Sequence, residues 1–452
     1  MRLINSIIVL LVPISTLLHG DQQHAKSLYA QACTLREQKQ HEQAYALFKQ
    51  ACEVYPSPEY CCNYAHMATL LGDWPTAIGL YQSIISHYPQ WIDIAYNLAH
   101  VLKQNQSLDD AIKIYQYVIA HKPRHEQAHL GLACAYLDKG DFVNGWKEHA
   151  WHQQFRGLYA PELRTLLEQK ALAGKTVLLC PEGGLGDTLL FIRFAQLLKQ
   201  HGATIIAIVQ KPLVQLCSLC PYLDNVIAHH EQLTPPPYHA RATYMSLPSI
   251  MALNDQQMAP CVPYLVAQPE LVTEWKKKLA DDRSFKIGIN WQVDAHNDLS
   301  RSPVGQRSLP LELFARIATI PGVTLYSLQQ IGGLEQIPDF VKEHQLITFD
   351  NDFDKSHGAF IDSAALVSNL DLVISADSAI EHLAGGLGKP VWILLAYESD
   401  WRWFTYRQTD TPWYPTARLF RQPKPFDWQS VIETVATEIE QIIQKRNNNE
   451  TT

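Results

Sequence analysis

The chain has 452 residues, more than one ordinary domain holds, and its length gives an expectation of about three domains. Its composition of 47% hydrophobic and 18% charged residues is that of a globular protein, which excludes a mainly disordered or collagen-like chain. The formal net charge of -8, with no visible cluster of Lys and Arg, argues against nucleic acid as a partner, because phosphate backbones are bound by clustered positive charge.

Residues 1–20 form a signal-like or anchor segment, with one early Arg, an apolar stretch over 7–18 and Gly20 before a polar region. About a dozen apolar residues is short for a transmembrane helix, which needs about 20. The nine cysteines are scattered, and several lie inside apolar runs, which favours a reducing compartment. We therefore expect a cytoplasmic protein, at the inner membrane if this segment anchors it, with export through the segment as the alternative.

Internal repeats are indicated over residues 21–160. Pro56, Pro89 and Pro123 lie 33 and 34 residues apart, and each closes a segment of the same internal arrangement. Small residues recur twelve and twenty-four positions before each proline: Ala44, Ala77 and Ala111, and Ala32, Ala65 and Ala99. Small residues let two consecutive helices pack closely, and proline ends the second helix. The spacing resembles the tetratricopeptide repeat over residues 25 to about 123, with a degenerate fourth unit at 129–154. We expect a protein partner in the groove of the repeats.

From residue 174 the pattern changes to short apolar runs that alternate with amphipathic segments, which is typical of βαβ units and a parallel sheet. The first set of expected strands lies at 175–180, 203–210, 224–229 and 242–250. After a charged helix at 270–282, the second set lies at 285–292, 322–329, 345–350, 370–377 and 389–396. We predict two Rossmann-like domains over 174–280 and 284–446, the second closed by a helix at 427–445. The fold class is thus α + α/β.

The CxxC pair Cys217 and Cys220 lies within the first of these sets. A second cysteine pair or a nearby His-x-x-x-His would be needed to complete a zinc set, and neither is visible. We therefore favour packing in the core or a turn over a metal or redox role.

A glycine loop follows the first strand, in the stretch PEGGLGDTLLF at 181–191. Its Gly183, Gly184 and Gly186 let backbone approach a ligand, but the dinucleotide fingerprint needs a further glycine where Leu189 stands, and the P-loop residues GKT at 174–176 precede the strand instead of following it. Bound NAD and Walker-type ATP hydrolysis are therefore not expected. Asp187 either caps the following helix or acts as a general base in a cleft.

In the second set, Asp377 and Ser378 fall at the carboxyl end of a strand, where open α/β sheets bind ligands. The helix that follows offers free N–H groups and a positive dipole end to a diphosphate. His382 can face the same side as Ser378, although a structural role for this histidine stays open. Gly385 and Gly386 follow in the same helix.

Two further segments could line such a site. The strand at 285–292 carries Trp291 near its end, and the loop after it carries Arg301 and Arg307, which could point positive charge at phosphate oxygens or be solvated. The aromatic segment at 397–415 could form a wall of the cleft, although buried packing explains its tryptophans as well.

Several motifs in combination resemble the heptosyltransferase family, glycosyltransferase family nine, and more closely its bacterial members fused to tetratricopeptide repeats, over residues 25–445. These motifs are GGLGDTLLFIRFA, GINWQ, RSLPLELFARI, DLVISADSAIEHLAGGLGKPVWILL and DWRWF…PWYPTARLFRQ. The resemblance implies a GT-B fold, with a nucleotide-sugar donor in the C-terminal domain and an acceptor facing the N-terminal one. It implies inversion by direct displacement, with no metal and no cofactor.

The resemblance also assigns roles to residues. Asp187 would be the base that activates the acceptor hydroxyl, next to an acceptor-side loop of Gly183, Gly184 and Gly186. The donor-binding residues would be Asp377, Ser378, His382, Gly385, Gly386, Trp291 and Arg307.

The sequence also departs from the lipopolysaccharide heptosyltransferases, which usually carry glycine where Ala379 stands and which lack repeats. Heptose and a lipid A core are therefore not expected as substrates. The layout is similar to that of protein O-GlcNAc transferases, by analogy only. We favour an inverting glycosyltransferase acting on a glycan or protein acceptor, with the repeats recruiting acceptor or partner. The alternative is a non-catalytic, repeat-based scaffold with a degenerate GT-B domain.

Overall fold

The computed structural model describes residues 22–155, 160–230, 233–258, 262–295, 298, 303–350 and 352–450. The signal-like segment 1–20 and Arg301 lie outside these residues. The chain divides into two compact units, one up to Lys139 together with 303–304, and the other from Gly140 onward. None of the described helices is long and apolar enough to cross a membrane.

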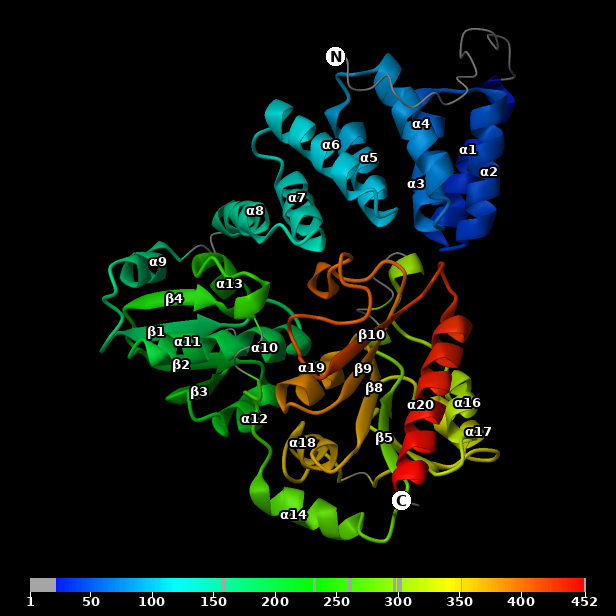
Figure 1. Ribbon diagram of the computed structural model, residues 1–452. Helices are drawn as coiled ribbons and strands as arrows, with labels where there is room; N and C mark the ends of the chain where they lie inside the picture. The colour runs from blue at the N-terminus through cyan, green and yellow to red at the C-terminus, as the bar shows by residue number, and fades with distance from the viewer. Residues whose placement is uncertain are drawn as a thin grey trace. The chain divides into compact units, whose positions relative to one another are not determined.

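The first unit is an array of α-helices, which Figure 1 shows in blue to cyan. The helices are α1 (Gln22–Glu37), α2 (His41–Val54), α3 (Pro58–Leu70), α4 (Trp74–His87), α5 (Ile92–Gln104), α6 (Leu108–His121) and α7 (Glu126–Asp138). Pro56, Pro89 and Pro123 each follow the end of the second helix of a pair. All six repeated alanines are fully buried, because the helices approach too closely there for a larger side chain. The predicted repeats are therefore confirmed.

Two cysteines of the repeats differ from the expectation of free thiols. Cys52 of α2 and Cys61 of α3 form a disulfide, with Cα atoms 5.2 Å apart, because the turn between the helices brings the two side chains together. Cys217 and Cys220 are free and buried, and burial raises the pKa of the Cys220 thiol to about 11. This pair therefore behaves as core side chains.

The second unit begins with α8 (Phe142–Phe155), which the spacing of the repeats assigns to the degenerate fourth repeat. Trp146 of α8 donates its Nε1–H to the carbonyl of Leu253 at 2.5 Å, and Ser249 donates its hydroxyl to the carbonyl of Trp146 at 3.0 Å. The fourth repeat is therefore divided, since α7 belongs to the first unit and α8 to the second.

The first sheet is parallel throughout, in the order β3-β2-β1-β4. Its strands are β1 (Thr176–Cys180), β2 (Thr204–Val209), β3 (Asn225–Ala228) and β4 (Ala240–Thr243). Its helices are α9 (Pro161–Glu168), α10 (Leu185–Phe191), α11 (Ala195–Gln200), α12 (Val214–Ser218) and α13 (Leu247–Ile250). The predicted strand at 242–250 is wrong beyond Thr243, where the chain turns helical; Pro248 suits a first helical turn and cannot donate to a strand ladder.

The second sheet is also parallel, in the order β10-β9-β8-β5-β6-β7. Its strands are β5 (Phe285–Asn290), β6 (Val323–Ser327), β7 (Leu346–Ile347), β8 (Leu372–Ala376), β9 (Val391–Leu395) and β10 (Ala417–Arg421). The strand β10 was not predicted. The helices are α14 (Pro269–Lys278), α16 (Ala315–Ala318), α17 (Ile337–Phe340), α18 (Ile361–Val367), α19 (Ala379–Gly386) and α20 (Trp428–Glu450).

Short 3-10 helices join several of these elements in the second unit. They are η2 (Ile192–Phe194), η3 (Lys211–Leu213), η4 (Tyr244–Ser246), η5 (Asp255–Gln257), η6 (Pro303–Gly305), η7 (Leu311–Phe314), η8 (Leu334–Gln336) and η9 (Trp401–Trp403).

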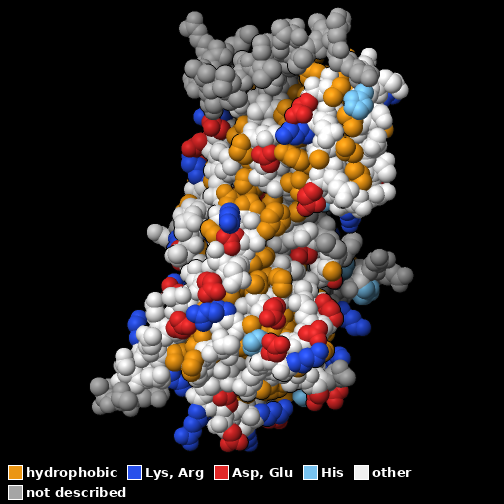
Figure 2. Space-filling view, turned by 90° about the vertical axis from the view of Figure 1, so that its right-hand side faces the viewer, with side chains coloured by type: hydrophobic (Ala, Val, Ile, Leu, Met, Phe, Trp, Pro, Cys, Tyr) orange, Lys and Arg blue, Asp and Glu red, His pale blue; other side chains and the backbone are white. Residues whose placement is uncertain are grey.

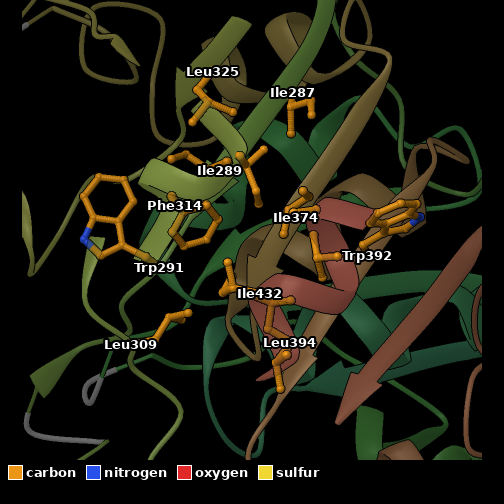
Figure 3. Packing of buried hydrophobic residues seen from close by; sticks show 14 of the residues in the cluster. Ile287, Ile289, Trp291, Leu309, Phe314, Leu325, Ile374, Trp392, Leu394 and Ile432 are labelled. Carbon is orange, nitrogen blue, oxygen red and sulfur yellow. The ribbon is translucent and has the colours of Figure 1, made fainter. Parts of the chain in front are cut away.

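The core of the second sheet lies between its strands and the closing helix, as Figure 3 shows. Ile289 of β5 and Ile374 of β8 face Ile432 of α20 in a cluster of buried residues. Asp427 caps α20 by accepting from the backbone N–H of Ser430 at 3.1 Å. The predicted fold class, helical repeats followed by two Rossmann-like sheets, is confirmed. On the face in Figure 2, acidic and basic side chains lie mixed with one another.

Candidate functional site

The glycine loop after β1 holds Asp187 in the first turn of α10. The backbone N–H of Gly184 donates to Asp187 Oδ2 at 2.7 Å, so the carboxylate caps the helix as one interpretation of the sequence expected. Gly183 has a φ of 147°, and a Cβ atom at this position would lie 2.3 Å from the same oxygen. Only glycine therefore lets the carboxylate fold back over the loop.

The loop after β1 meets the turn after β8, although about 190 residues separate them in the sequence. Helices α10 and α19 lie side by side in Figure 1. A Cβ atom at Gly186 would lie 2.8 Å from Cδ2 of His382 and 3.2 Å from the carbonyl oxygen of Ser378. The predicted acceptor-side loop and the predicted donor-binding turn are therefore in direct contact.

The turn after β8 is held by a capping box at the start of α19. Ser378 accepts a hydrogen bond from the backbone N–H of Ile380 at 3.1 Å, and its own backbone N–H donates to Glu381 Oε1 at 2.7 Å. Glu381 is fully buried, and burial together with the nearby Asp377 carboxylate raises its pKa well above the ordinary value. Glu381 therefore holds its proton to a higher pH than an exposed carboxyl group does, a feature that the sequence did not indicate.

Asp377, Glu381 and His382 bring potential metal ligand atoms within 4.8 Å of one another. The Glu381 oxygens, however, accept hydrogen bonds from the backbone and hydroxyl of Ser378 and from the hydroxyl of Ser375. The carboxyl group is thus used to build the turn. The expectation that the site works without a metal stays a prediction.

His382 is buried between aromatic side chains. Its Nδ1 lies 2.8 Å from the hydroxyl of Tyr414, and its ring stacks on Trp403 with 5.6 Å between centroids and 8° between planes. Burial, with the nearby guanidinium groups of Arg402 and Arg193, lowers the pKa of His382 well below its ordinary value. The imidazole is therefore neutral and held in place by packing, and a contact with a donor stays a prediction.

Arg402, like Glu381, is a side chain of the site that the sequence alone did not indicate. It lies in η9, and its Nη2 donates to Asp187 Oδ1 while its Nη1 pairs with Asp400 Oδ1 at 2.5 Å. Its side chain is 13% exposed. Burial alone would lower its pKa, but the Asp187 and Asp400 carboxylates outweigh this and raise it. The permanently charged guanidinium of Arg402, from the domain of the second sheet, thus contacts Asp187, the predicted base in the domain of the first sheet.

The aromatic segment at 397–415 is packed against helix α10, which follows β1. Trp401, Trp403 and Trp413 are buried, which supports the packing interpretation of these residues. Trp413 contacts Phe191 of α10 edge to face, with 5.7 Å between centroids. The backbone carbonyl of Arg402 accepts from Trp413 Nε1 at 2.6 Å. The segment therefore fixes the backbone that carries the arginine.

Trp291 and Arg307 lie in different surroundings. Trp291 is fully buried in the core cluster beside Leu309 and Phe314 (Figure 3), so its packing accounts for it and donor contact stays a prediction. Arg307 is partly buried with its Nε 3.7 Å from Asp298, and its charge helps to lower the pKa of His382. Arg307 therefore contributes positive charge near the site.

Gly385 and Gly386 lie at the carboxyl end of α19 and serve close packing. A Cβ atom at Gly385 would lie 2.4 Å from the ring of Tyr414, and one at Gly386 would lie 2.6 Å from Leu265. A role in donor binding stays a prediction for both.

Several buried donors of this region have no hydrogen-bond partner among the described residues: Nε1 of Trp403 and the Nε atoms of Arg402 and Arg307. Buried N–H groups in folded proteins are nearly always paired. The surroundings of His382 therefore hold unused donors beside a positive charge, a combination that suits an anionic ligand.

The family model described as Tetratricopeptide repeat matches residues 25–58, so the chain contains this repeat. Protein FlbA of Caulobacter vibrioides is 23% identical over 448 residues, which cover 90% of this chain and 71% of that protein. A crystal structure of a glycosyl transferase family 9 protein from Veillonella parvula DSM 2008 matches over 58% of this chain and 91% of that one, with 15% identity and a TM-score of 0.43. MamA from Desulfovibrio magneticus RS-1 covers 34% of this chain and 88% of that one, with 17% identity and a TM-score of 0.28.

Proposed function

We propose that the chain is a glycosyltransferase that moves a sugar from a nucleotide-sugar donor to a hydroxyl group of a glycan or protein, while its repeats bind the acceptor or a partner protein. One observation carries the proposal: Asp187 after β1 and the Asp377 to His382 turn after β8 meet at the carboxyl ends of two parallel sheets. Such ends are where open α/β sheets bind ligands. Nucleotide sugars favour the cytoplasm as the compartment.

The transfer would proceed by direct displacement. The acceptor oxygen forms a bond to the anomeric carbon while its proton passes to the Asp187 carboxylate. The bond between that carbon and the donor phosphate breaks on the opposite face, and its electron pair stays on the phosphate oxygen. The configuration at the anomeric carbon is inverted, and the nucleoside diphosphate leaves with the negative charge.

The residues around the α19 N-terminus would stabilise that charge. The dipole of α19 favours negative charge at this end, and Arg402 and Arg307 add positive charge nearby. This scheme requires no metal and no cofactor besides the nucleotide sugar.

The variant Asp187→Asn tests the mechanism. The amide can still accept from Gly184, so the fold should be kept, while transfer should fall by about 10²- to 10⁴-fold, as on loss of a general base. Release of UDP, GDP or ADP from a panel of nucleotide sugars measures turnover. Full turnover in the variant would remove Asp187 from the reaction.

The alternative is a repeat-based scaffold whose GT-B part has lost catalysis. The Arg402 contact favours it, because that contact occupies the Asp187 oxygen that an acceptor would need. Thermal shift distinguishes the two functions: a scaffold should show no rise in Tm with any nucleotide sugar, whereas the enzyme should be stabilised by its donor.

A further inference from the structure

Both oxygens of Asp187 are occupied in the structure. Oδ2 accepts from the backbone N–H of Gly184, and Oδ1 accepts from the guanidinium of Arg402. The first contact caps α10 and leaves the second oxygen available in principle. The second contact places a cation where the proton of an acceptor hydroxyl would have to arrive. The predicted base is therefore blocked in this state.

The two Nη atoms of Arg402 have different partners, so Nη2 can leave Asp187 while Nη1 stays paired with Asp400. Asp400 holds Nη1 at 2.5 Å and also accepts from the backbone N–H of Arg402 at 3.1 Å. The backbone carbonyl of Arg402 is fixed by Trp413. Among the described residues, the bond from Nη2 to Asp187 is the one hydrogen bond between the arginine and the glycine loop. The guanidinium can thus turn without moving its backbone.

A diphosphate is the partner that suits this guanidinium. Arginine binds phosphate oxygens through two parallel hydrogen bonds, and a diphosphate carries more negative charge than one carboxylate. The Nε–H of Arg402 is buried and has no hydrogen-bond partner among the described residues. The Asp377 carboxylate lies at the start of the turn that faces α10, and its negative charge helps to raise the pKa of Arg402. The arginine therefore lies within reach of the diphosphate position that the proposed function assigns.

We propose that Arg402 is a positioning residue which passes from Asp187 to the donor diphosphate when a nucleoside diphosphate or its sugar binds, and that this exchange frees Asp187 to accept the acceptor proton. The inference rests on the proposed function. It makes the base active only when the donor is bound, and it requires the donor to bind before the acceptor.

In this exchange, Asp187 and the diphosphate compete for the Arg402 guanidinium. The proposal therefore predicts whether each substitution raises or lowers the Kd of a diphosphate. Calorimetry on the full chain measures the Kd of UDP, GDP, ADP and inorganic pyrophosphate. Asp187→Asn removes the competing charge, so the diphosphates that bind should bind more tightly, by roughly 5-fold or more. Arg402→Met should weaken them by roughly 10-fold or more, and the double variant should match Arg402→Met.

The chain offers a matched control in the same segment. Arg407 and Asp410 form an arginine–aspartate ion pair as well, with the Arg407 Nε 3.0 Å from Asp410 Oδ1. Asp410→Asn and Arg407→Met should leave every Kd unchanged. Arg402→Lys keeps the charge without the paired hydrogen bonds; it replaces Arg402→Met if circular dichroism shows that variant unfolded, and weaker binding is again expected.

Each outcome decides the matter. Tighter binding in Asp187→Asn with both pyrophosphate and a nucleotide, lost in the double variant, supports the exchange. An unchanged Kd in Asp187→Asn, or a gain confined to nucleotides, overturns the exchange and leaves the proposed function standing. Failure of every diphosphate to bind both the natural chain and its variants overturns the proposed function, and the exchange with it.

Discussion

At the scale of single residues, the site depends on the absence of a side chain as much as on the groups present. Gly183 leaves room for the Asp187 carboxylate, and Gly186 leaves room for the edge of His382. An added methyl group at Gly186 is costly, because the neighbours of this position are a backbone carbonyl and a buried ring.

Gly186→Ala should therefore destabilise the second unit by about 1–3 kcal/mol, since its Cβ must displace His382 or the Ser378 carbonyl. Thermal unfolding followed by circular dichroism measures the change. Gly79→Ala is the matched control: this glycine lies inside α4 with open space around its Cβ position, and alanine should stabilise the helix by about 1 kcal/mol. Equal effects of the two substitutions would contradict the contact between the loop and the turn.

Glu381 predicts a pH dependence of stability. Its pKa is raised in the folded state, so the folded chain holds this proton more tightly than the unfolded chain does. The stability contributed by the proton is present below the unfolded pKa, near 4.5, and is lost as the pH rises towards the higher folded pKa.

Glu381→Gln keeps the shape of the capping box without the charge. Its Tm should exceed that of the natural chain by a margin that grows as the pH rises above about 4.5, because the Glu381 carboxyl group can lose a proton and the amide cannot. Scanning calorimetry at several pH values gives the margin. A constant difference across the range would mean that Glu381 does not titrate as the burial implies.

At the scale of elements, the spacing of the repeats does not determine which part of the molecule α8 packs against. The helical pattern of 129–154 predicts two helices, and two helices form, but the pattern does not say against which neighbours each one packs. In the structure, Trp146 of α8 packs within the second unit. It donates a hydrogen bond to the Leu253 carbonyl and contacts Trp401 edge to face, with 5.9 Å between ring centroids. The helix thus supports the segment that carries Arg402.

Shortened chains test this assignment of α8. A chain that begins at residue 140 should fold with the unfolding midpoint that the second unit has in the full protein. One that begins at residue 160 loses α8 and with it the contacts of a buried tryptophan, about 3–5 kcal/mol. Its midpoint should fall. Equal midpoints for the two chains would show that α8 belongs to the repeats.

At the scale of the whole molecule, the sequence predicts the features that depend on a repeated spacing or on residues close together in the chain. Evenly spaced prolines and alanines identify the helical array, and strand ends identify Asp377 and Ser378. Arg402 could not be found in this way, because its partner Asp187 is 215 positions distant and only tertiary packing joins them. The disulfide between Cys52 and Cys61 was not predicted, because an odd number of scattered cysteines does not indicate which of them pair.

The buried guanidinium of Arg193 has a consequence for how the two sheets can move. This arginine of η2 donates to the carbonyl of Trp413 and to the hydroxyl of Tyr264, and its charge lies 4.4 Å and 4.6 Å from the ring centres of Tyr264 and Tyr414. A wide hinge opening would strip a cation of all these neighbours at once, at a cost of several kcal/mol. Arg193 and its partners therefore oppose a wide separation of the two sheets.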